Sequence, residues 1–158
     1  MSGNREARNV GQKNLRKGRH SLENYIYHVT IVTNGRKKIF IDLAPGRLVV
    51  RSLIRLERTG RATTMAFVVM PDHMHWLFHL PQNSNLSSTV GSMKSQSSNL
   101  INCRLGLSGA NWQRGFHDRA LRRDEDIVQV ARYIVANPLR AGLVSDIGEY
   151  PHWYSIWV

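Results

Sequence analysis

The sequence predicts an α+β fold in which an antiparallel sheet carries helices on one or both faces. Stretches with the alternation of β-strands are interleaved with stretches of helical periodicity along the 158 residues. Two of the β-like stretches follow one another through a tight turn, which is typical of an antiparallel hairpin. The length suits one domain, and a hydrophobic content of 42% can fill its core. We therefore expect a basic N-terminal arm over residues 1–22 and a single domain over residues 23–158.

The arm is predicted from its composition. It contains one acidic residue, Glu6, and too few apolar residues for a packed face. Its basic residues include Arg16, Lys17 and Arg19, which we expect to contact an anionic partner.

The first strand is predicted from residue 25 onwards, where YIYHVTIVT combines β-branched and aromatic residues. Successive side chains of a strand point to opposite faces, so His28 and Thr30 are expected on the face opposite Tyr27 and Val29. Asn34-Gly35 then marks a turn.

A helix is predicted between Pro45-Gly46 and Gly60, because apolar residues recur there with helical spacing. The same helix carries a stripe of arginines with the spacing i, i+4, i+8, i+11: Arg47, Arg51, Arg55 and Arg58. Such a stripe is often a solvated helix face, but in so basic a chain contact with phosphates is an equal alternative.

The middle of the chain is expected to form a hairpin followed by a second helix. The β-like runs 62–70 and 73–80 flank Pro71-Asp72. The helix is expected over residues 85–105, with Gly106 at its end.

The C-terminal third is expected to contain an extended segment and a last helix. Residues 112–121 form the extended segment. The helix is predicted to run from Asp124, as N-cap, to Asn137, where Pro138 would stop it.

The net charge of the chain limits the classes of molecule that it is expected to bind. With 22 Lys+Arg against 11 Asp+Glu the formal net charge is +11, which favours nucleic acid first and an anionic membrane second. One cysteine excludes an intramolecular disulfide framework and any zinc module built from several cysteines. No apolar run of about 18 or more residues and no apolar signal core are seen, so we expect a cytoplasmic protein.

Two places in the sequence hold residues suited to chemistry. His73 and His75 would project from the same face of the second hairpin strand, although such a pair also occurs as ordinary half-buried polar residues. Tyr133 and Asn137, four apart on the last helix, would point the same way. Asparagine offers a neutral oxygen suited to Mg²⁺ or Mn²⁺, and tyrosine can act as a nucleophile or be a plain boundary aromatic.

These residues resemble a known family. HMHWLFHL (73–80) resembles the His-hydrophobic-His (HUH) motif of single-tyrosine DNA transposases and relaxases. YIVANPLRAGLV (133–144), preceded by WQRGFHDRALRRDED (112–126), is similar to the motif pair of REP-associated tyrosine transposases. MPDHMHWL (70–77) also matches the way that family enters its HUH strand.

The resemblance implies a ferredoxin-like antiparallel sheet with packed helices, the HUH endonuclease fold. It implies that His73, His75 and Asn137 bind the metal and that Tyr133 attacks the scissile phosphate, giving a 5′-phosphotyrosine. Insertion-sequence relatives often place Gln four residues after the tyrosine, whereas this chain has Asn137, as in the REP-associated branch.

It also implies a partner and a cellular setting. The partner would be single-stranded DNA folded into imperfect-palindrome hairpins, held by the arginine stripe, the arm and Arg122. The protein would be a monomer, with a dimer as the alternative, associated with the nucleoid and not with a membrane.

Three other functions are weighed against this one. A nucleotide hydrolase of the HIT type would need a third alternate histidine, but Leu77 stands there. A non-catalytic nucleic-acid binder explains the charge and leaves the histidine pair, Tyr133 and Asn137 without a role. A domesticated, inactive relative that only binds DNA is compatible with the sequence.

Overall fold

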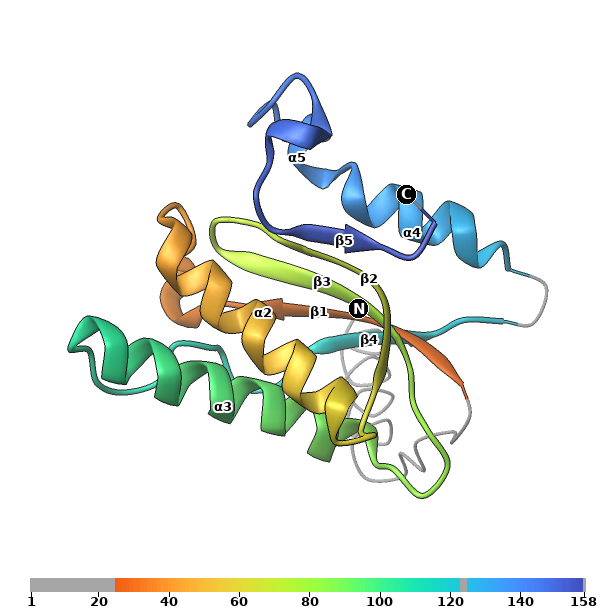
Figure 1. Ribbon diagram of the computed structural model, residues 1–158, viewed down its shortest axis with the longest axis horizontal. Coiled ribbons are helices and arrows are strands. Elements are labelled where there is room, and N and C mark those ends of the chain that lie inside the picture. Colours follow the sequence, from red (N-terminus) through yellow and green to blue (C-terminus); the bar gives the residue numbers. More distant parts are fainter. Residues whose placement is uncertain (1–24, 123–124, 158) are drawn as a thin grey trace, which may run out of the picture.

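Residues 25–122 and 125–157 are described by the computed structural model, and they form a five-stranded antiparallel sheet (Figure 1). The strand order is β4-β1-β3-β2-β5, so β3 is the central strand. The strands are β1 (Ile26–Val32), β2 (Thr63–Val69), β3 (His73–His79), β4 (His117–Ala120) and β5 (Trp153–Ser155).

Helices cover both faces of the sheet. Helix α2 (Leu43–Arg58) and helix α3 (Leu86–Leu105) lie on one face, and α4 (Ile127–Val135), followed by α5 (Asn137–Arg140), lies on the other (Figure 1). Two short 3₁₀ turns, Asn34–Arg36 and Ile147–Glu149, lie in the connections. This arrangement confirms the predicted antiparallel sheet with packed helices. In the part of the chain described above, no helix is both long and apolar enough to cross a membrane.

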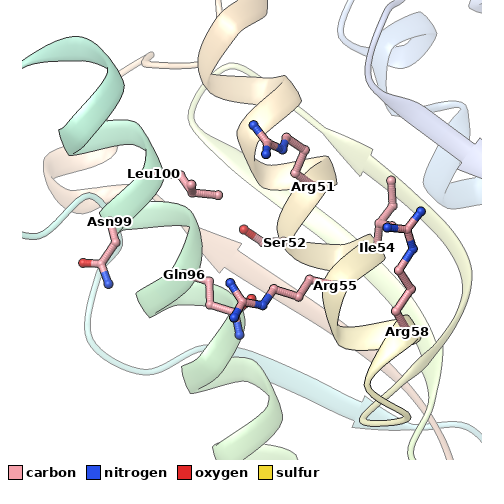
Figure 2. Close-up of a pocket in the computed structure, with 8 residues that line it drawn as sticks. All are labelled: Arg51, Ser52, Ile54, Arg55, Arg58, Gln96, Asn99 and Leu100. Atoms are coloured by element: carbon pink, nitrogen blue, oxygen red, sulfur yellow. The ribbon is translucent and has the colours of Figure 1, made fainter.

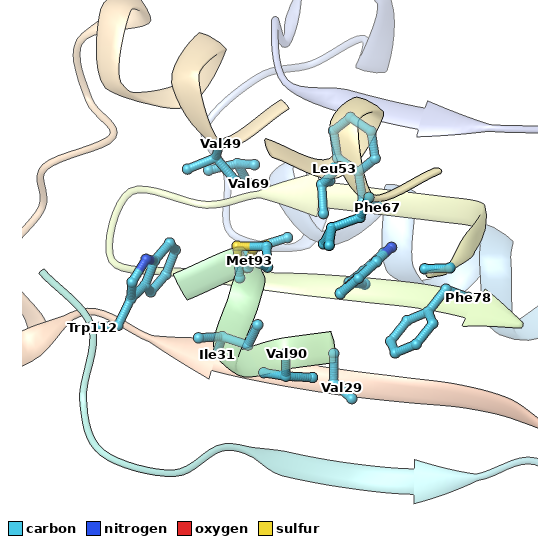
Figure 3. Close-up of a cluster of buried hydrophobic side chains, with 14 of the residues drawn as sticks. Val29, Ile31, Val49, Leu53, Phe67, Val69, Phe78, Val90, Met93 and Trp112 are labelled. Carbon is cyan, nitrogen blue, oxygen red and sulfur yellow. The ribbon is translucent and has the colours of Figure 1, made fainter. Parts of the chain in front are cut away.

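The larger hydrophobic cluster lies between the sheet and helices α2 and α3. Met74, Trp76 and Phe78 alternate along β3 and all point into it. Figure 3 shows Phe78 of β3 in the same cluster as Val90 and Met93 of α3. The Trp76 indole N–H donates to Thr64 Oγ1 at 3.1 Å, so its one polar atom is satisfied inside the core.

A smaller hydrophobic cluster lies on the opposite face, beneath α4. Leu77 of β3 and Val68 of β2 meet Ala131, Ile134 and Val135 of the helix there. The buried apolar residues of α4 therefore pack on the sheet. This cluster fixes the helix on the face of β3 that His73 and His75 share, since alternate residues of a strand point the same way.

Three expectations about element boundaries are wrong. Helix α2 begins at Leu43, before Pro45, and not after Pro45-Gly46 as expected. A proline is tolerated in the first turn of a helix, because the backbone N–H that it lacks would have no helical partner there. Helix α4 begins at Ile127, and its N-cap is Asp126, whose side chain accepts from the backbone N–H groups of Val128 and Gln129; the expected cap, Asp124, lies outside the described residues.

Pro138 also does not stop the helical path, because it stands in the first turn of α5 and needs no backbone N–H there. Within the extended segment expected over 112–121, only His117–Ala120 forms a strand of the sheet. Strand β5, for which no element was predicted, pairs with β2 at the edge of the sheet. The N-terminal arm with Arg16, Lys17 and Arg19 lies outside the described residues.

Gly46 provides a test of the contact between α2 and the C-terminal segment. A Cβ atom at Gly46 would lie 2.3 Å from Cδ2 of the buried His152 ring, which is too close for any real contact. Gly46→Ala should therefore lower the free energy of unfolding by roughly 1–3 kcal/mol, measured by urea denaturation.

Gly91→Ala is the matched control, because Gly91 is also helical and nothing lies within 4 Å of the position that a Cβ atom would take there. It should raise the free energy of unfolding by about 0.5–1 kcal/mol through helix propensity. Equal stabilities for the two variants would contradict the close packing of His152 on α2.

Candidate active site

Two imidazoles stand side by side on the central strand. His73 and His75 are both half-buried, and their ring centroids are 5.1 Å apart in an edge-to-face arrangement. They lie on the face of the sheet that α4 covers, because the intervening Met74 and the following Trp76 point into the opposite cluster. The pair predicted from the sequence is therefore a pair in space.

Each of the two rings is held through its Nδ1 atom. The Nδ1 of His73 lies 2.7 Å from Oδ1 of Asp72. The Nδ1 of His75 lies 3.0 Å from Nε2 of His28 and 3.1 Å from Oγ1 of Thr30, both on the neighbouring strand β1. In both histidines the Nε2 atom is left to bind a ligand, and the partner at Nδ1 fixes the orientation of the ring.

The turn that carries Asp72 is itself anchored. The backbone carbonyl of Asp72 accepts from the N–H and from the hydroxyl of the buried Thr33, both at 2.9 Å. Burial alone would raise the pKa of the Asp72 carboxyl, but the hydrogen bond and charge of His73, with the charge of Arg36, outweigh it and lower this pKa. The Asp72 side chain is thus a carboxylate that orients His73.

His75 is kept neutral by its surroundings. Burial lowers its pKa to about 3, and the positive charges of His28, His73 and Arg140 act in the same direction. Burial and the charge of Arg119 also lower the pKa of His28. Neutral imidazole is the form that binds a metal ion, so His75 needs no deprotonation at neutral pH to serve as a ligand.

Tyr133 projects from α4 into solvent. Its side chain is 61% exposed, although its neighbour Ile134 is fully buried in the cluster on the sheet. The guanidinium of Arg140, on α5, covers the ring, with Cζ 3.7 Å from the ring centroid. The charge of Arg140 also contributes to lowering the pKa of His75.

Asn137 lies one helical turn beyond Tyr133. Its Nδ2 donates to the backbone carbonyl of Ile134 at 2.8 Å, which fixes the amide and leaves Oδ1 as an acceptor. Within residues 25–122 and 125–157 no three His, Cys, Asp or Glu side chains are grouped so that they could hold a metal ion. Asn137 Oδ1, a neutral amide oxygen, is of the ligand type that Mg²⁺ or Mn²⁺ takes in proteins.

The predicted arginine stripe is on the other side of the sheet. All four arginines are exposed on α2, and three of them line a groove of about 520 Å³ between α2 and α3 (Figure 2). Figure 2 shows Arg55 extending from α2 towards Gln96 of α3. The residues lining this α2–α3 groove are Arg51, Ser52, Ile54, Arg55, Arg58, Gln96, Asn99 and Leu100.

The other predicted DNA contacts are placed differently. Arg47 lies outside the α2–α3 groove and acts electrostatically on His152. Arg122 is exposed in the connection between β4 and α4, where its backbone N–H donates to Glu125. The sheet thus separates the arginine stripe from His73, His75 and Tyr133.

Sequence reasoning missed four residues around the candidate site: His28, Thr30, Asp72 and Arg140. The alternation of the first strand correctly separated His28 and Thr30 from the core, but no local spacing relates them to His75, which is more than forty positions away. Asp72 was recognised only as a turn residue. Arg140 falls seven residues after Tyr133, a helical spacing that could have indicated it.

A sheet with two histidines on its central strand, facing a helix with an exposed tyrosine, is typical of the HUH class of proteins. The family model for IS200-like transposases matches residues 21–137, and the chain belongs to this family.

Named relatives refine the family. The REP-associated tyrosine transposase of Escherichia coli is 30% identical, with the match covering 63% of this chain and 58% of that protein. A putative REP-associated tyrosine transposase of Haemophilus influenzae is 29% identical over 56% of each chain. This chain thus matches less than two thirds of the length of either relative.

A solved structure shares the fold. A REP-associated tyrosine transposase bound to a REP hairpin superposes with a TM-score of 0.70 at 25% identity, covering 85% of this chain and 79% of that chain. The sheet and its packed helices therefore have the fold of this transposase.

The buried imidazole of His75 makes stability depend on pH. Unfolded His75 takes up a proton near its ordinary pKa of 6.5, and the folded residue only near about 3. Between these values the unfolded state binds more protons, so the free energy of unfolding falls as the pH falls below 6.5. Urea denaturation of the metal-free protein at pH 7.5 and 4.5 measures this loss, and it should be smaller in His75→Gln. An equally steep pH dependence in His75→Gln would contradict the buried neutral ring.

Proposed function

We propose that this chain cuts and rejoins single DNA strands through a covalent bond between Tyr133 and the 5′ phosphate at the break. The observation that carries the proposal is the exposed Tyr133 on α4, the helix that packs on the face of the sheet that carries His73 and His75. It ties a candidate nucleophile to a candidate metal site within one chain. Membership of the IS200-like transposase family supports the same reaction.

The proposed reaction conserves the energy of the phosphodiester. The phenolic oxygen of Tyr133 attacks phosphorus, the bond from phosphorus to the 3′ oxygen breaks, and that oxygen leaves as a 3′-hydroxyl after taking up a proton. A 3′-hydroxyl can later attack the phosphotyrosine and restore the strand without ATP. Because Tyr133 is 61% exposed, a strand can reach it without opening the core.

His73, His75 and Asn137 would hold a divalent ion, Mg²⁺ or Mn²⁺. When bound, the ion would polarise a non-bridging oxygen and offset charge in the transition state. None of the three donors is an anion, so the full charge of the cation would stay available for the phosphate. Asp72, His28 and Thr30 hold the two imidazoles through Nδ1, which would leave Nε2 of each ring for the ion.

The DNA partner we propose is a single strand folded into a hairpin. A similar transposase was solved bound to a REP hairpin, and the net charge of +11 suits a polyanion. Arg51, Arg55 and Arg58 in the α2–α3 groove would bind phosphates, with Arg47, Arg122 and the arm residues Arg16, Lys17 and Arg19 as further contacts. The protein would act where such DNA is found, on the nucleoid.

One copy of the chain should suffice for the reaction. The helix that carries Tyr133 packs on the same face of the sheet as His73 and His75 within one chain, which supports a reaction that needs no tyrosine from a second copy. We therefore propose a monomer as the active form.

Tyr133→Phe tests the proposed nucleophile. Wild-type protein incubated with hairpin-forming single-stranded DNA and Mn²⁺ or Mg²⁺ should yield a protein–DNA adduct that survives denaturation on a gel. Tyr133→Phe lacks the attacking oxygen and should yield none, while its affinity for the hairpin stays within about threefold of wild type, since the ring is kept. EDTA should also abolish the adduct.

The outcome separates catalysis from DNA binding alone. An adduct that persists in Tyr133→Phe would rule out Tyr133 as nucleophile. Tight hairpin binding by the wild type without any adduct would favour the inactive, domesticated DNA-binding protein instead.

The α2–α3 groove predicts a change in salt dependence. The triple variant Arg51→Gln/Arg55→Gln/Arg58→Gln should bind the hairpin more weakly and with a shallower slope of log affinity against log salt. The slope should fall by about 0.7–0.9 for each phosphate that the variant no longer neutralises. Fluorescence anisotropy over a salt series measures it.

A charge-matched control uses three exposed cations outside the groove, Lys37→Gln/Lys38→Gln/Arg104→Gln. If both triple variants changed the slope equally, the groove would have no special share in DNA binding.

A further inference from the structure

We propose that Arg140 is a further catalytic residue, whose guanidinium binds a non-bridging oxygen of the scissile phosphate while it lies over the Tyr133 ring. This inference rests on the proposed function and deepens it, because it assigns a second positive group to the same phosphate.

The backbone places Arg140 over the nucleophile. The Arg140 N–H donates to the carbonyl of Ala136 at 3.0 Å, and the Ala141 N–H donates to that of Asn137 at 2.9 Å, so helical hydrogen bonding continues from α4 into α5. Residues seven apart on a helical path lie on the same face. The guanidinium reaches back to within 3.7 Å of the Tyr133 ring centroid, well inside the range of a cation–π contact.

The guanidinium is available for an anion. Arg140 is exposed, and among the described residues no carboxylate forms an ion pair with it. Arginine offers five N–H donors in a planar fork that matches phosphate oxygens, and stacking on an aromatic ring leaves the edge of that fork open. A phosphate approached by the Tyr133 oxygen would therefore meet N–H donors at once.

Its charge also extends towards the metal-binding side of the site. Arg140 lies on α5, which follows α4 on the face of the sheet that carries His73 and His75 (Figure 1). A phosphate placed between the tyrosine and the histidine pair would thus be flanked by the guanidinium on the helix side. The position is the one from which a fixed cation stabilises charge that develops in a transition state.

The step leaves the protonation of Arg140 unchanged. The bond from the Tyr133 oxygen to phosphorus forms, the bond from phosphorus to the 3′ oxygen breaks, the phenolic proton passes to solvent and the 3′ oxygen takes a proton from solvent. The guanidinium donates hydrogen bonds to a non-bridging oxygen throughout. Its contribution is greatest as negative charge accumulates on the equatorial oxygens.

The first experiment measures rates. With a hairpin oligonucleotide whose cleavage position has been mapped on the wild-type adduct, Arg140→Gln should slow single-turnover adduct formation by roughly 100-fold at saturating DNA. Arg140→Lys keeps the charge and should recover at least part of that loss. Arg132→Gln is the matched control and should react at the wild-type rate, because Arg132 is exposed on α4 and points about 100° away from Tyr133. Circular-dichroism melting checks that all variants are folded.

The second experiment asks whether Arg140 touches the scissile phosphate itself. In a Tyr133→Phe background, which keeps the ring and prevents cleavage, hairpin affinity is compared for a native phosphate and a neutral methylphosphonate at the mapped position. Arg140→Gln should weaken binding of the native DNA by about tenfold and leave binding of the methylphosphonate DNA nearly unchanged. A residue that only stabilises the helix would weaken both equally.

The results that overturn the inference are distinct from those that overturn the function. If wild-type protein forms the adduct and Arg140→Gln stays within threefold of its rate, Arg140 is not catalytic. An equal affinity loss for native and methylphosphonate DNA would likewise overturn the phosphate contact. If wild-type protein forms no adduct at all, the proposed function fails and the role of Arg140 fails with it.

Discussion

The two-residue alternation of β3 is the constraint on which the rest of the structure depends. Met74, Trp76 and Phe78 must enter the cluster under α2 and α3, so His73 and His75 must face α4. A shift of the strand by one residue would reverse both faces, moving the tryptophan to the face under α4 and burying the imidazoles among the apolar side chains of the larger cluster. Since β3 is paired on both sides, by β1 and β2, its register is fixed from two directions. The rigidity of the histidine pair follows from the packing of the opposite face.

The two halves of the candidate site are held by different means. The imidazoles are fixed by neighbours within the sheet, because the β1–β3 register pairs Thr30 directly with His75 and brings His28 within hydrogen-bonding distance. Tyr133 instead projects from a short helix that is held by a small apolar cluster. Firmly held imidazoles and an exposed tyrosine suit the proposed reaction, in which a long DNA strand has to enter, become covalently attached and leave again.

Local patterns in the sequence predicted most helices and strands. Features that depend on contacts between distant segments of the chain could not be predicted. The hairpin around Pro71-Asp72 is confirmed because its turn and both strands are adjacent in sequence. His28 was correctly placed on the side of its strand away from the core, but its contact with His75 depends on the register of two strands that are far apart in the chain. Strand β5 has three residues, too few for a visible alternation, and it exists because β2 offers it an edge.

The position of the arginine stripe relative to the sheet also depends on contacts between distant segments, and it affects how DNA could bind. Helical spacing predicted that the arginines share one face of α2, but the sequence contains no information on which side of the sheet that helix packs. The α2–α3 groove lies on the side of the sheet with α2 and α3, and α4, which carries Tyr133, lies on the other side; Figure 1 shows these three helices. A DNA molecule that contacts both at once has to pass around an edge of the sheet. Such a DNA would reach both the α2–α3 groove and Tyr133 only if the single strand between the hairpin and the scissile phosphate were long enough. A strand too short to span the two sites could not bind both at once. For the proposed function, the sheet would thus act as a spacer, and the position of cleavage would depend on its distance from the hairpin.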